Sequence, residues 1–466
     1  MRVSRVLYIV ALGILFSGCS ALPQQWHFSA PGEVQASIAK TEHHLAMDLG
    51  WEDFFQSEPR LIVLIRSALT NNPDFRLAVL KIEETRASLG LTESFWYPTV
   101  TALLEKEKAG TIGKERDSQP LMKFSAIPNQ PVATLRFDYE IDVFGRVKAE
   151  REAALAEYLA TESTARTIRL ALIGEVATAY FRERMLDETL YWAGRLRENQ
   201  SRWHGNVKAM NKVGMGDAVS NTHVVVLGAK SDLDTLTLEQ EMLRVRALLR
   251  TLVGDDPLEL PPPRHVRLMT FPLIRSDLST EALMRRSDVE AASHALTARE
   301  AGAAAARAAF FPKVSLAGLL GKVDSSVKAM LGAGGGWAII PQTIFTLFDG
   351  GRKNAELKVA EVHREEAVAR QRKVVAGARA EIEFAEAARK NLAEQVALYE
   401  DLVHRQKMHQ QTVLSLTVLP PPTGKSQAEA LMAERDYYAA EQALLQAQFS
   451  FIKSSIELYK ALGGQY

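Results

Sequence analysis

Few side chains in this sequence could carry chemistry, and the first of them is the single cysteine, Cys19. One thiol can form neither an internal disulfide nor a cysteine-rich metal site. The ten histidines are scattered, and none has the i, i+4 spacing beside an acid that marks a zinc-binding helix. No serine–histidine–aspartate arrangement can be argued, and the many carboxylates alternate with Lys and Arg on helical faces. We therefore expect no enzyme, no metal site and no cofactor other than a covalent lipid.

The position of Cys19 predicts that lipid. A positively charged start, a short apolar run and two small residues precede the cysteine, as in an export signal. This order resembles the lipobox of bacterial lipoproteins, although Phe16 stands where an aliphatic residue is usual. The alternative is an ordinary signal peptide with a chance cysteine nearby. We expect residues 1–18 to be removed, Cys19 to be lipidated, and residues 19–58 to form an extended N-terminal segment.

Charge and hydropathy narrow the classes of function further. Lys plus Arg number 56 and Asp plus Glu number 56, so the formal net charge is zero. A dedicated nucleic-acid-binding protein would show a basic excess, so we expect no nucleic-acid partner. Beyond the N-terminus no run of about 18 apolar residues appears, so a membrane role would need strands or a lipid.

The sequence contains two similar halves. Asp74 and Pro98 are 24 positions apart, and so are Asp288 and Pro312. Each segment is a helical pattern, then two aromatic residues, then the proline and an alternating pattern, because proline ends a helix and favours an extended run. We predict a first repeat over 59–254, a Pro-rich connector over 255–273 and a second repeat over 274–466.

A second pair of landmarks lies later in each half, where an extended run meets glycine, then arginine, then a long helical pattern. Glycine supplies the tight turn that a change from strand to helix needs. We expect the prolines, glycines and arginines of both pairs to be structural residues where strands join helices: Pro98, Gly145, Arg146, Pro312, Gly350, Gly351 and Arg352.

Residues 133–142 alternate strictly between apolar and polar side chains. A length of about ten residues suits a tilted strand that crosses a bilayer, although a strand of a soluble sheet would also alternate. Further strands are expected over 98–106, 313–321 and 337–347. In a membrane barrel, the polar face of residues 133–142 would line the lumen with Thr134, Arg136, Asp138 and Glu140.

Four strands cannot close a barrel by themselves. An open edge in lipid leaves unpaired backbone groups that cost several kcal/mol each, and the smallest common membrane barrel has about 8 strands. Several chains must therefore contribute strands to one barrel, and a trimer would give twelve.

Two helical patterns without proline run over 147–212 and 353–418, about 66 residues or roughly 100 Å each. Such lengths suggest coiled-coil pairing or a tube that spans the periplasm. Returning helices are expected over 218–253 and 426–462. The breaks between outgoing and returning helices would form a tip that contacts a partner, and plain turn formation is the equal alternative for its residues. The candidates are Gly214, Gly216, Gly424 and Lys425.

Together these features resemble the TolC-like outer-membrane factors, the channels of RND-type tripartite efflux pumps, in their lipoprotein branch. The resemblance runs from Trp51 to the C-terminus. It rests on Trp51-x-x-Phe54-Phe55, Asn72-Pro73-Asp74, Asp142-Val143-Phe144-Gly145-Arg146, Phe310-Phe311-Pro312, Phe348-Asp349-Gly350-Gly351-Arg352 and Leu458-Tyr459-Lys460-Ala461-Leu462-Gly463-Gly464.

The resemblance implies an α+β membrane protein that acts as a homotrimer. Each chain would give four strands to a shared twelve-stranded barrel in the outer membrane, while its helices form a coiled-coil tunnel across the periplasm. The implied partners are a periplasmic adaptor protein, an inner-membrane RND transporter and outer-membrane lipid. The implied function is passive export of small molecules.

One departure from the family concerns the tip. Relatives carry an aspartate in the returning helix of the second hairpin, and Met432 stands at that position. This substitution predicts an apolar constriction of the tunnel in place of an acidic one.

Two alternatives to an efflux channel stay open at this point. One is the outer-membrane duct of a type I protein secretion system, which would use the same fold. The other is a periplasmic coiled-coil scaffold lipoprotein, whose strands would pack in a soluble domain.

Overall fold

The computed structural model describes residues 50–106, 131–214, 218–254, 283–323, 336–417 and 424–464, which all belong to one compact unit over Leu49–Tyr466. The signal segment, Cys19 and the Pro-rich connector 255–273 lie outside the described residues. Of the helices in these ranges, none reaches the combination of length and hydropathy that a bilayer crossing demands.

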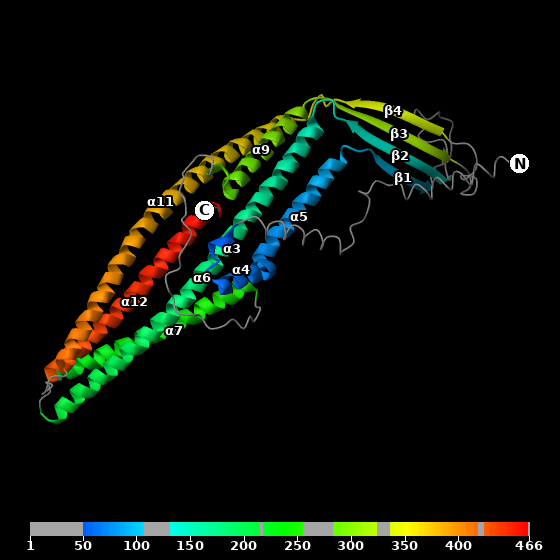
Figure 1. Ribbon diagram of the computed structural model, residues 1–466. Coiled ribbons are helices and arrows are strands. Elements are labelled where there is room, and N and C mark those ends of the chain that lie inside the picture. The colour runs from blue at the N-terminus through cyan, green and yellow to red at the C-terminus, as the bar shows by residue number, and fades with distance from the viewer. Residues whose placement is uncertain are drawn as a thin grey trace, which may run out of the picture. The chain divides into compact units, whose positions relative to one another are not determined.

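Helices make up most of the unit, and four strands form one sheet (Figure 1). The first half contains α3 Trp51–Phe54, α4 Pro59–Asn71, α5 Pro73–Ser94, β1 Thr99–Lys106, β2 Pro131–Ile141, α6 Arg146–Lys212 and α7 Ala218–Val253. The second half contains α9 Ser287–Ala308, β3 Lys313–Val323, β4 Gly336–Ile344, α11 Arg352–Thr417 and α12 Gly424–Ala461. The long helices and the four strands lie within three residues of their predicted bounds, so the predicted combination of long helices with four strands is confirmed.

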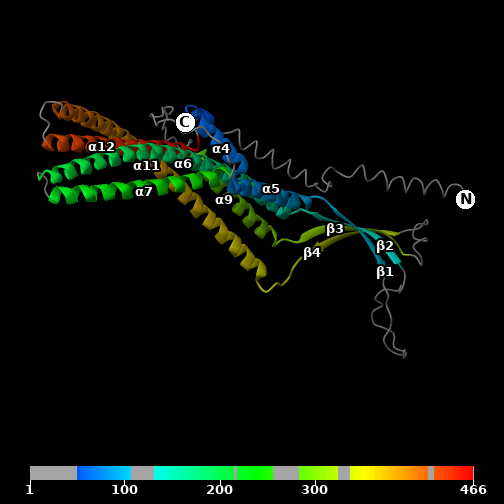
Figure 2. The same cartoon turned by 90° about the horizontal axis from the view of Figure 1, so that it is seen from below.

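The four strands form an antiparallel sheet in the order β1-β2-β3-β4. The central pair, β2 and β3, joins the two halves of the chain, and β1 and β4 are the two edge strands. The sheet lies at one end of the unit, and the turns of the two long helical hairpins point to the other end (Figures 1 and 2).

Both helix-to-strand junctions have the same local structure. α5 ends at Ser94 and α9 at Ala308, and in each case a short turn leads to a proline and then to the strand. Proline has no backbone N–H for a helix and sets an extended start, so Pro98 and Pro312 have the structural position that was predicted.

The reverse change, from strand to long helix, depends on glycine and aspartate. Gly145 has a φ of 76°, and Gly350 and Gly351 have φ values of 65° and 86°, which favour residues without a Cβ. The carboxylate of Asp142 accepts a hydrogen bond from the backbone N–H of Lys148 at 2.8 Å. The carboxylate of Asp349 similarly accepts from the N–H groups of Gly351 and Lys353, at 3.0 and 3.2 Å. These bonds satisfy N–H groups that have no partner within the first helical turn.

The long helix α6 is the centre of the helical part. Among the described elements it packs against α4, α5, α7, α9 and α12, whereas α11 packs mainly against α9 and α12. The difference appears in burial. α6 buries a side chain on most of its turns, while α11 buries just five of its described residues: Ala367, Ala378, Ile382, Ala385 and Val396.

The segment before α4 is not extended, which corrects the prediction for the end of residues 19–58. Residues 51–54 form the short helix α3, whose Trp51 and Phe54 are buried together with Phe55. The Phe54 ring stacks on Tyr459 of α12, with centroids 4.4 Å apart and planes at 17°. Burying these aromatic rings favours a compact turn over a strand, because each can remove 150 Å² or more of surface from water.

Glu58 fastens the same segment to α6. Its carboxylate accepts hydrogen bonds from the Tyr180 hydroxyl at 2.7 Å and from the Arg184 guanidinium at 2.5 Å. Burial, together with the bond to this carboxylate, raises the pKa of Tyr180 well above its ordinary value. The phenol therefore remains a proton donor to Glu58 at any physiological pH.

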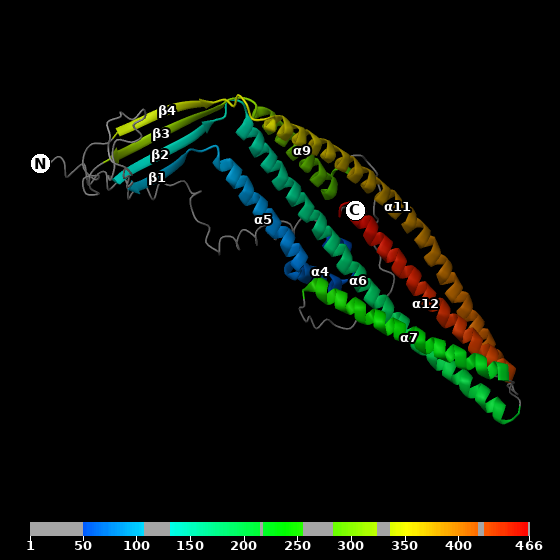
Figure 3. The same ribbon diagram turned by 180° about the vertical axis from the view of Figure 1, so that it is seen from behind.

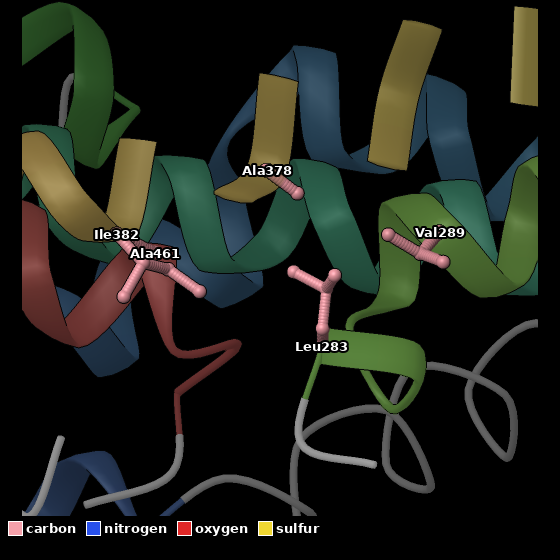
Figure 4. Close-up of a cluster of buried hydrophobic side chains, with 5 residues drawn as sticks. All are labelled: Leu283, Val289, Ala378, Ile382 and Ala461. Atoms are coloured by element: carbon pink, nitrogen blue, oxygen red, sulfur yellow. The ribbon is translucent and has the colours of Figure 1, made fainter. Parts of the chain in front are cut away.

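Arg286 ties the start of α9 to the end of α12 and to the middle of α11. Its guanidinium donates to the Ala461 carbonyl of α12 at 2.7 Å, and it pairs with Asp288 at 2.6 Å and with Glu381 of α11 at 2.8 Å. Beside it, apolar side chains from these three helices and from Leu283, which precedes α9, form a small core (Figure 4), which comprises Leu283, Val289, Ala378, Ile382 and Ala461. Asn72 has the corresponding place in the first half, since its amide donates to the Leu252 carbonyl of α7 at 3.0 Å.

Replacing Arg286 by methionine should lower the stability of the protein by about 2 kcal/mol, because the helix-end carbonyl of Ala461, the partly buried Asp288 and the largely exposed Glu381 lose a buried charged partner. Chemical denaturation of the detergent-solubilised protein, followed by circular dichroism, measures the change. Arg405→Met is the matched control, because Arg405 and Asp401 form an exposed pair that should contribute at most about 0.5 kcal/mol. Equal effects of the two substitutions would contradict the role given to Arg286.

Candidate functional site

One face of the sheet is apolar and uncovered by any described element. Its side chains come from all four strands, as the register shows, and include Val100, Leu135, Phe137, Leu316, Leu320, Trp337 and Ile339. The exposed fractions of Trp337 and Ile339 are 75% and 62%. A sheet face of this kind is unfavourable in water and suits hydrocarbon.

The opposite face carries the four side chains that were predicted to line a lumen. Thr134, Arg136, Asp138 and Glu140 lie on one face of β2, and the register places Thr99 and Thr101 of β1 and Ser315 of β3 beside them. Arg136 and Asp138 form an ion pair at 2.7 Å. Towards the loop end of β3 and β4, the same face becomes less polar, with Ala317, Leu319 and Ile340.

Glu140 also has a partner at the junction with the helices. Arg146, the first residue of α6, binds both oxygens of Glu140 at 2.7 and 2.8 Å and binds Glu150 at 2.6 Å. A bidentate arginine–carboxylate pair fixes direction as well as distance. Arg146 therefore sets the angle at which the long helix leaves the sheet, and the Phe144 ring stacks on Phe311 beside it at 4.9 Å.

The corresponding residue of the second half makes a weaker connection. Arg352 pairs with Glu356 on its own helix at 2.9 Å, and both side chains are more than half exposed. Leu347 and Phe348 precede this junction with exposed fractions of 89% and 90%. The two junctions are therefore alike in backbone but differ in how firmly side chains hold them.

At the other end of the unit, the two helical hairpins lie side by side (Figures 2 and 3). Trp203 and Val207 of α6, Val224 of α7 and Leu431 of α12 form a buried cluster that joins them. The hairpins are thus in contact near their turns.

A polar network next to this cluster connects α6 with α12. The Glu434 carboxylate accepts hydrogen bonds from Asn199 at 2.8 Å, from Arg202 at 2.5 Å and from Tyr438 at 2.6 Å. Partial burial by itself would raise the pKa of Glu434, but the bonds from Tyr438, Asn199 and Arg202 hold the pKa below its usual value. The carboxylate is ionised at neutral pH, and the link between the two hairpins is charged.

Met432 lies one residue beyond the buried Leu431 and is 40% exposed. It lies two residues before Glu434 on α12. Whether it narrows a tunnel stays a prediction.

The residues predicted for the tip have different outcomes. Gly214 has a φ of 75° and lies in the turn after α6, as expected. Gly424 is not a turn residue: α12 begins with it, and Lys425 follows inside the helix. α12 thus begins two residues earlier than predicted. No proline follows Pro422 in this segment, and proline is the residue that a helix interior cannot accept. Gly216 lies outside the described residues.

The sequence did not point to the Glu434 network. Tyr438 lies one turn after Glu434 on the same helix, which is a local signal. Asn199 and Arg202, however, are 235 and 232 positions away. Nothing in the local pattern indicates that these residues meet, because the meeting depends on how two hairpins pack.

No group of three or more potential metal ligands is present among the residues that the structure describes. The arrangement is that of a wall with one apolar and one polar face, continued by long helices.

Comparison with known proteins agrees with this geometry. The family described as outer membrane efflux protein matches residues 64–255 and 278–464. The toluene efflux pump outer membrane protein TtgI of Pseudomonas putida is 30% identical, over 97% of this chain and 96% of its own length. The cation efflux system protein CusC of Escherichia coli K12 is 29% identical, over 98% of each chain.

Solved structures of outer-membrane channels have the same fold. The open state of the MtrE channel of Neisseria gonorrhoeae superposes with a TM-score of 0.75 at 29% identity, covering 90% of this chain and 92% of that chain. A CusC structure gives a TM-score of 0.73 at 28% identity, covering 87% and 92%. The chain therefore belongs to the outer membrane efflux protein family and is an outer-membrane component of an efflux pump.

Proposed function

We propose that three copies of this chain form one passive duct that carries small molecules through the outer membrane. The barrel would contain twelve strands, four from each copy, and the helices would continue the duct into the periplasm. The observation that carries the proposal is that the sheet of one chain ends in two unpaired edge strands, β1 and β4.

The sheet edges supply the first support. Among the described residues β1 and β4 each pair on one side, so each leaves a row of backbone N–H and C=O groups without partners there. In lipid every such group costs several kcal/mol, and the apolar face requires lipid around it. Head-to-tail pairing of β4 with β1 of another copy removes both edges, and rotation closes the ring.

The helices supply the second support. Among the described elements, α11 packs mainly against α9 and α12, whereas α6 packs against five helices. α11 carries exposed apolar side chains, among them Val359, Phe384 and Leu398, with Phe384 71% exposed. On α7, Val226, Leu233 and Leu236 are also largely exposed. Apolar stripes at both edges of the wall favour closure by further copies.

We also propose that the two halves are copies of one structural unit. The halves have the same order of helices and strands. In each, a side chain before the aspartate of α5 or α9 donates to the last turn of the returning helix: Asn72 to Leu252, and Arg286 to Ala461. A trimer of such chains would have six nearly equivalent units around its axis.

The turns of the hairpins are the proposed contact with a periplasmic adaptor protein and, through it, with an inner-membrane transporter. The names of the relatives place them in efflux pumps, one for toluene and one for cations, so the family serves unlike solutes. We propose that this chain is the shared duct and that solute choice lies with the inner-membrane partner. A lipid on Cys19 would anchor each copy in the outer membrane.

The link between α6 and α12 is the proposed restraint on opening. A resting duct must be narrow at its periplasmic end, and opening requires the hairpins to move apart when a partner binds the open state better. The Glu434 carboxylate holds the hairpins together by accepting hydrogen bonds from Asn199 and Arg202 of α6, and Tyr438 of its own helix donates a third bond to it. Met432, beside it, is the proposed apolar constriction.

Phe384→Glu should prevent or weaken trimer formation, because it places a charge on the apolar stripe of α11. Size-exclusion chromatography with light scattering in mild detergent measures the mass of the assembly. Phe384→Leu is the control, since it keeps the stripe apolar and should remain trimeric. A wild-type protein that is monomeric under these conditions would refute the trimer itself.

Glu434→Gln should raise the open probability of the channel in planar bilayers about ten-fold, because loss of the charge weakens the link by about 1.4 kcal/mol. The exposed Glu429, near the start of the same helix, gives the control Glu429→Gln, which should leave the currents unchanged. A Glu434→Gln channel that stays as closed as the wild type would exclude this network as a restraint.

Lowering the pH should raise the open probability of the wild-type channel, as Glu434→Gln does. A carboxylate whose pKa is lowered by folding stabilises the closed state fully above its unfolded pKa, for which the ordinary value is 4.5. That stabilisation is lost as the pH falls through the lowered pKa. Wild-type currents should therefore rise only when the pH is brought below about 4.5, and Glu434→Gln currents should lack this step.

Cys19→Ala should abolish labelling by radioactive palmitate, yet the protein should still need detergent for extraction, because the barrel and not the lipid holds it in the membrane. Alkaline carbonate washing of membranes followed by immunoblotting distinguishes the cases. Release of Cys19→Ala by carbonate would support a lipid-anchored periplasmic scaffold in place of a channel.

A further inference from the structure

We propose that the seam between protomers has one defined register, with Leu347, three residues after the end of β4, opposite Val100 of β1 on the next copy. In this register Phe345 lies opposite Ala102. The inference rests on the proposed trimer, and it adds the residue pairs that close the barrel. The register is obtained from the pairing of strands inside one chain. We take the pairing of β2 with β3, which joins the two halves, as the model for the pairing of β4 with β1 of the next copy.

The template is the pairing of β2 with β3, which joins the first half to the second. In this pair Ile141 lies opposite Val314, Tyr139 opposite Leu316 and Phe137 opposite Gly318. If the six units around the axis are nearly equivalent, then β4 must meet β1 of the next copy in the same way as β2 meets β3.

Two correspondences transfer the register. Thr99 and Lys313 are the residues directly after Pro98 and Pro312, so they correspond to each other in β1 and β3. Within the first half Thr99 lies opposite Asp138, and within the second half Lys313 lies opposite Ile344. Asp138 of β2 therefore corresponds to Ile344 of β4.

Counting from these fixed points gives the seam. Ile141 is three residues beyond Asp138 and therefore corresponds to Leu347, three residues beyond Ile344. Val314 is one residue beyond Lys313 and corresponds to Val100. Because Ile141 lies opposite Val314, Leu347 is assigned opposite Val100, and the same step assigns Phe345 opposite Ala102.

The side-chain pattern provides an independent check. Leu347 and Phe345 continue the alternation of Trp337 and Ile339, whose side chains lie on the apolar face. Val100 lies directly opposite Phe137, whose side chain is on the same face of β2 as that of Leu135. Val100 is therefore on the apolar face as well. A register displaced by one residue would put these side chains on opposite faces of the barrel, so the counted register is one that keeps the apolar face continuous.

Exposure at the junction supplies a second check. β2 extends to Ile141, but β4 ends at Ile344, so the three residues 345–347 pair with no strand in the described part of the chain. Leu347 is 89% exposed and Phe345 is 55% exposed, while Val100 on the other edge is 53% exposed. The register gives these residues partners and lengthens β4 to match β2.

Disulfide trapping tests the register with four cysteine pairs made from the same four positions. The in-register pairs are L347C with V100C and F345C with A102C. The swapped pairs are L347C with A102C and F345C with V100C. Directly opposite residues have Cα atoms about 4.5–5.5 Å apart, whereas a shift of two residues brings the distance to about 8 Å, beyond the reach of a disulfide.

Outer membranes that contain each variant are oxidised with copper phenanthroline and analysed by non-reducing electrophoresis. Both in-register pairs should give covalent dimers and trimers at least about ten-fold faster than the swapped pairs. The wild type, which has Cys19 alone, is the blank.

Light scattering on the same variants measures the mass of the assembly, which distinguishes a wrong register from the absence of a trimer. Faster crosslinking of the swapped pairs, or none from any pair in a protein that is trimeric, would overturn the register while the trimer stands. A protein that is monomeric would overturn the proposed function together with the register.

Discussion

The structure depends on one constraint: backbone N–H and C=O groups must find partners wherever water is absent. A four-stranded antiparallel sheet satisfies this rule internally but not at β1 and β4. Its apolar face makes water a poor surrounding, so the edges cannot be left to solvent. The rest of the unit follows from this condition. The chain supplies a segment of wall with matching edges, and the long helices extend that wall beyond the bilayer.

The wall also requires firm joints where its components change direction. Glycines with positive φ and capping aspartates make the turn from strand to helix in both halves. In the first half, Arg146 adds a bidentate bond to Glu140, whereas Arg352 bonds to its own helix. At the far end of the helices, the Glu434 carboxylate connects the two hairpins through charged bonds. The strand-to-helix turns are held by backbone geometry and capping bonds, whereas the link between the hairpins depends on one charged side chain. This difference suits the proposed duct, which opens at its periplasmic end.

Local patterns predicted the elements well, for identifiable reasons. The alternation in residues 133–142, the prolines at 98 and 312 and the glycine–arginine turns act over a few residues, and so the sequence displays them directly. Contacts between distant helices are different. The bonds of Arg286 to Ala461 and of Glu434 to Asn199 span 175 and 235 positions, and no short pattern encodes them. The segment around Trp51 was mistaken for an extended one because its aromatic residues bury against Tyr459, at the other end of the chain.

The sparse packing of α11 has a consequence for biogenesis. This helix has 66 residues, yet few of them are buried before a neighbour arrives. In the proposed assembly, a protomer that has not yet met further copies exposes the apolar side chains of α11 and of the sheet face, and such surfaces favour non-native contacts. The yield of assembled ducts should therefore depend on the local concentration of protomers.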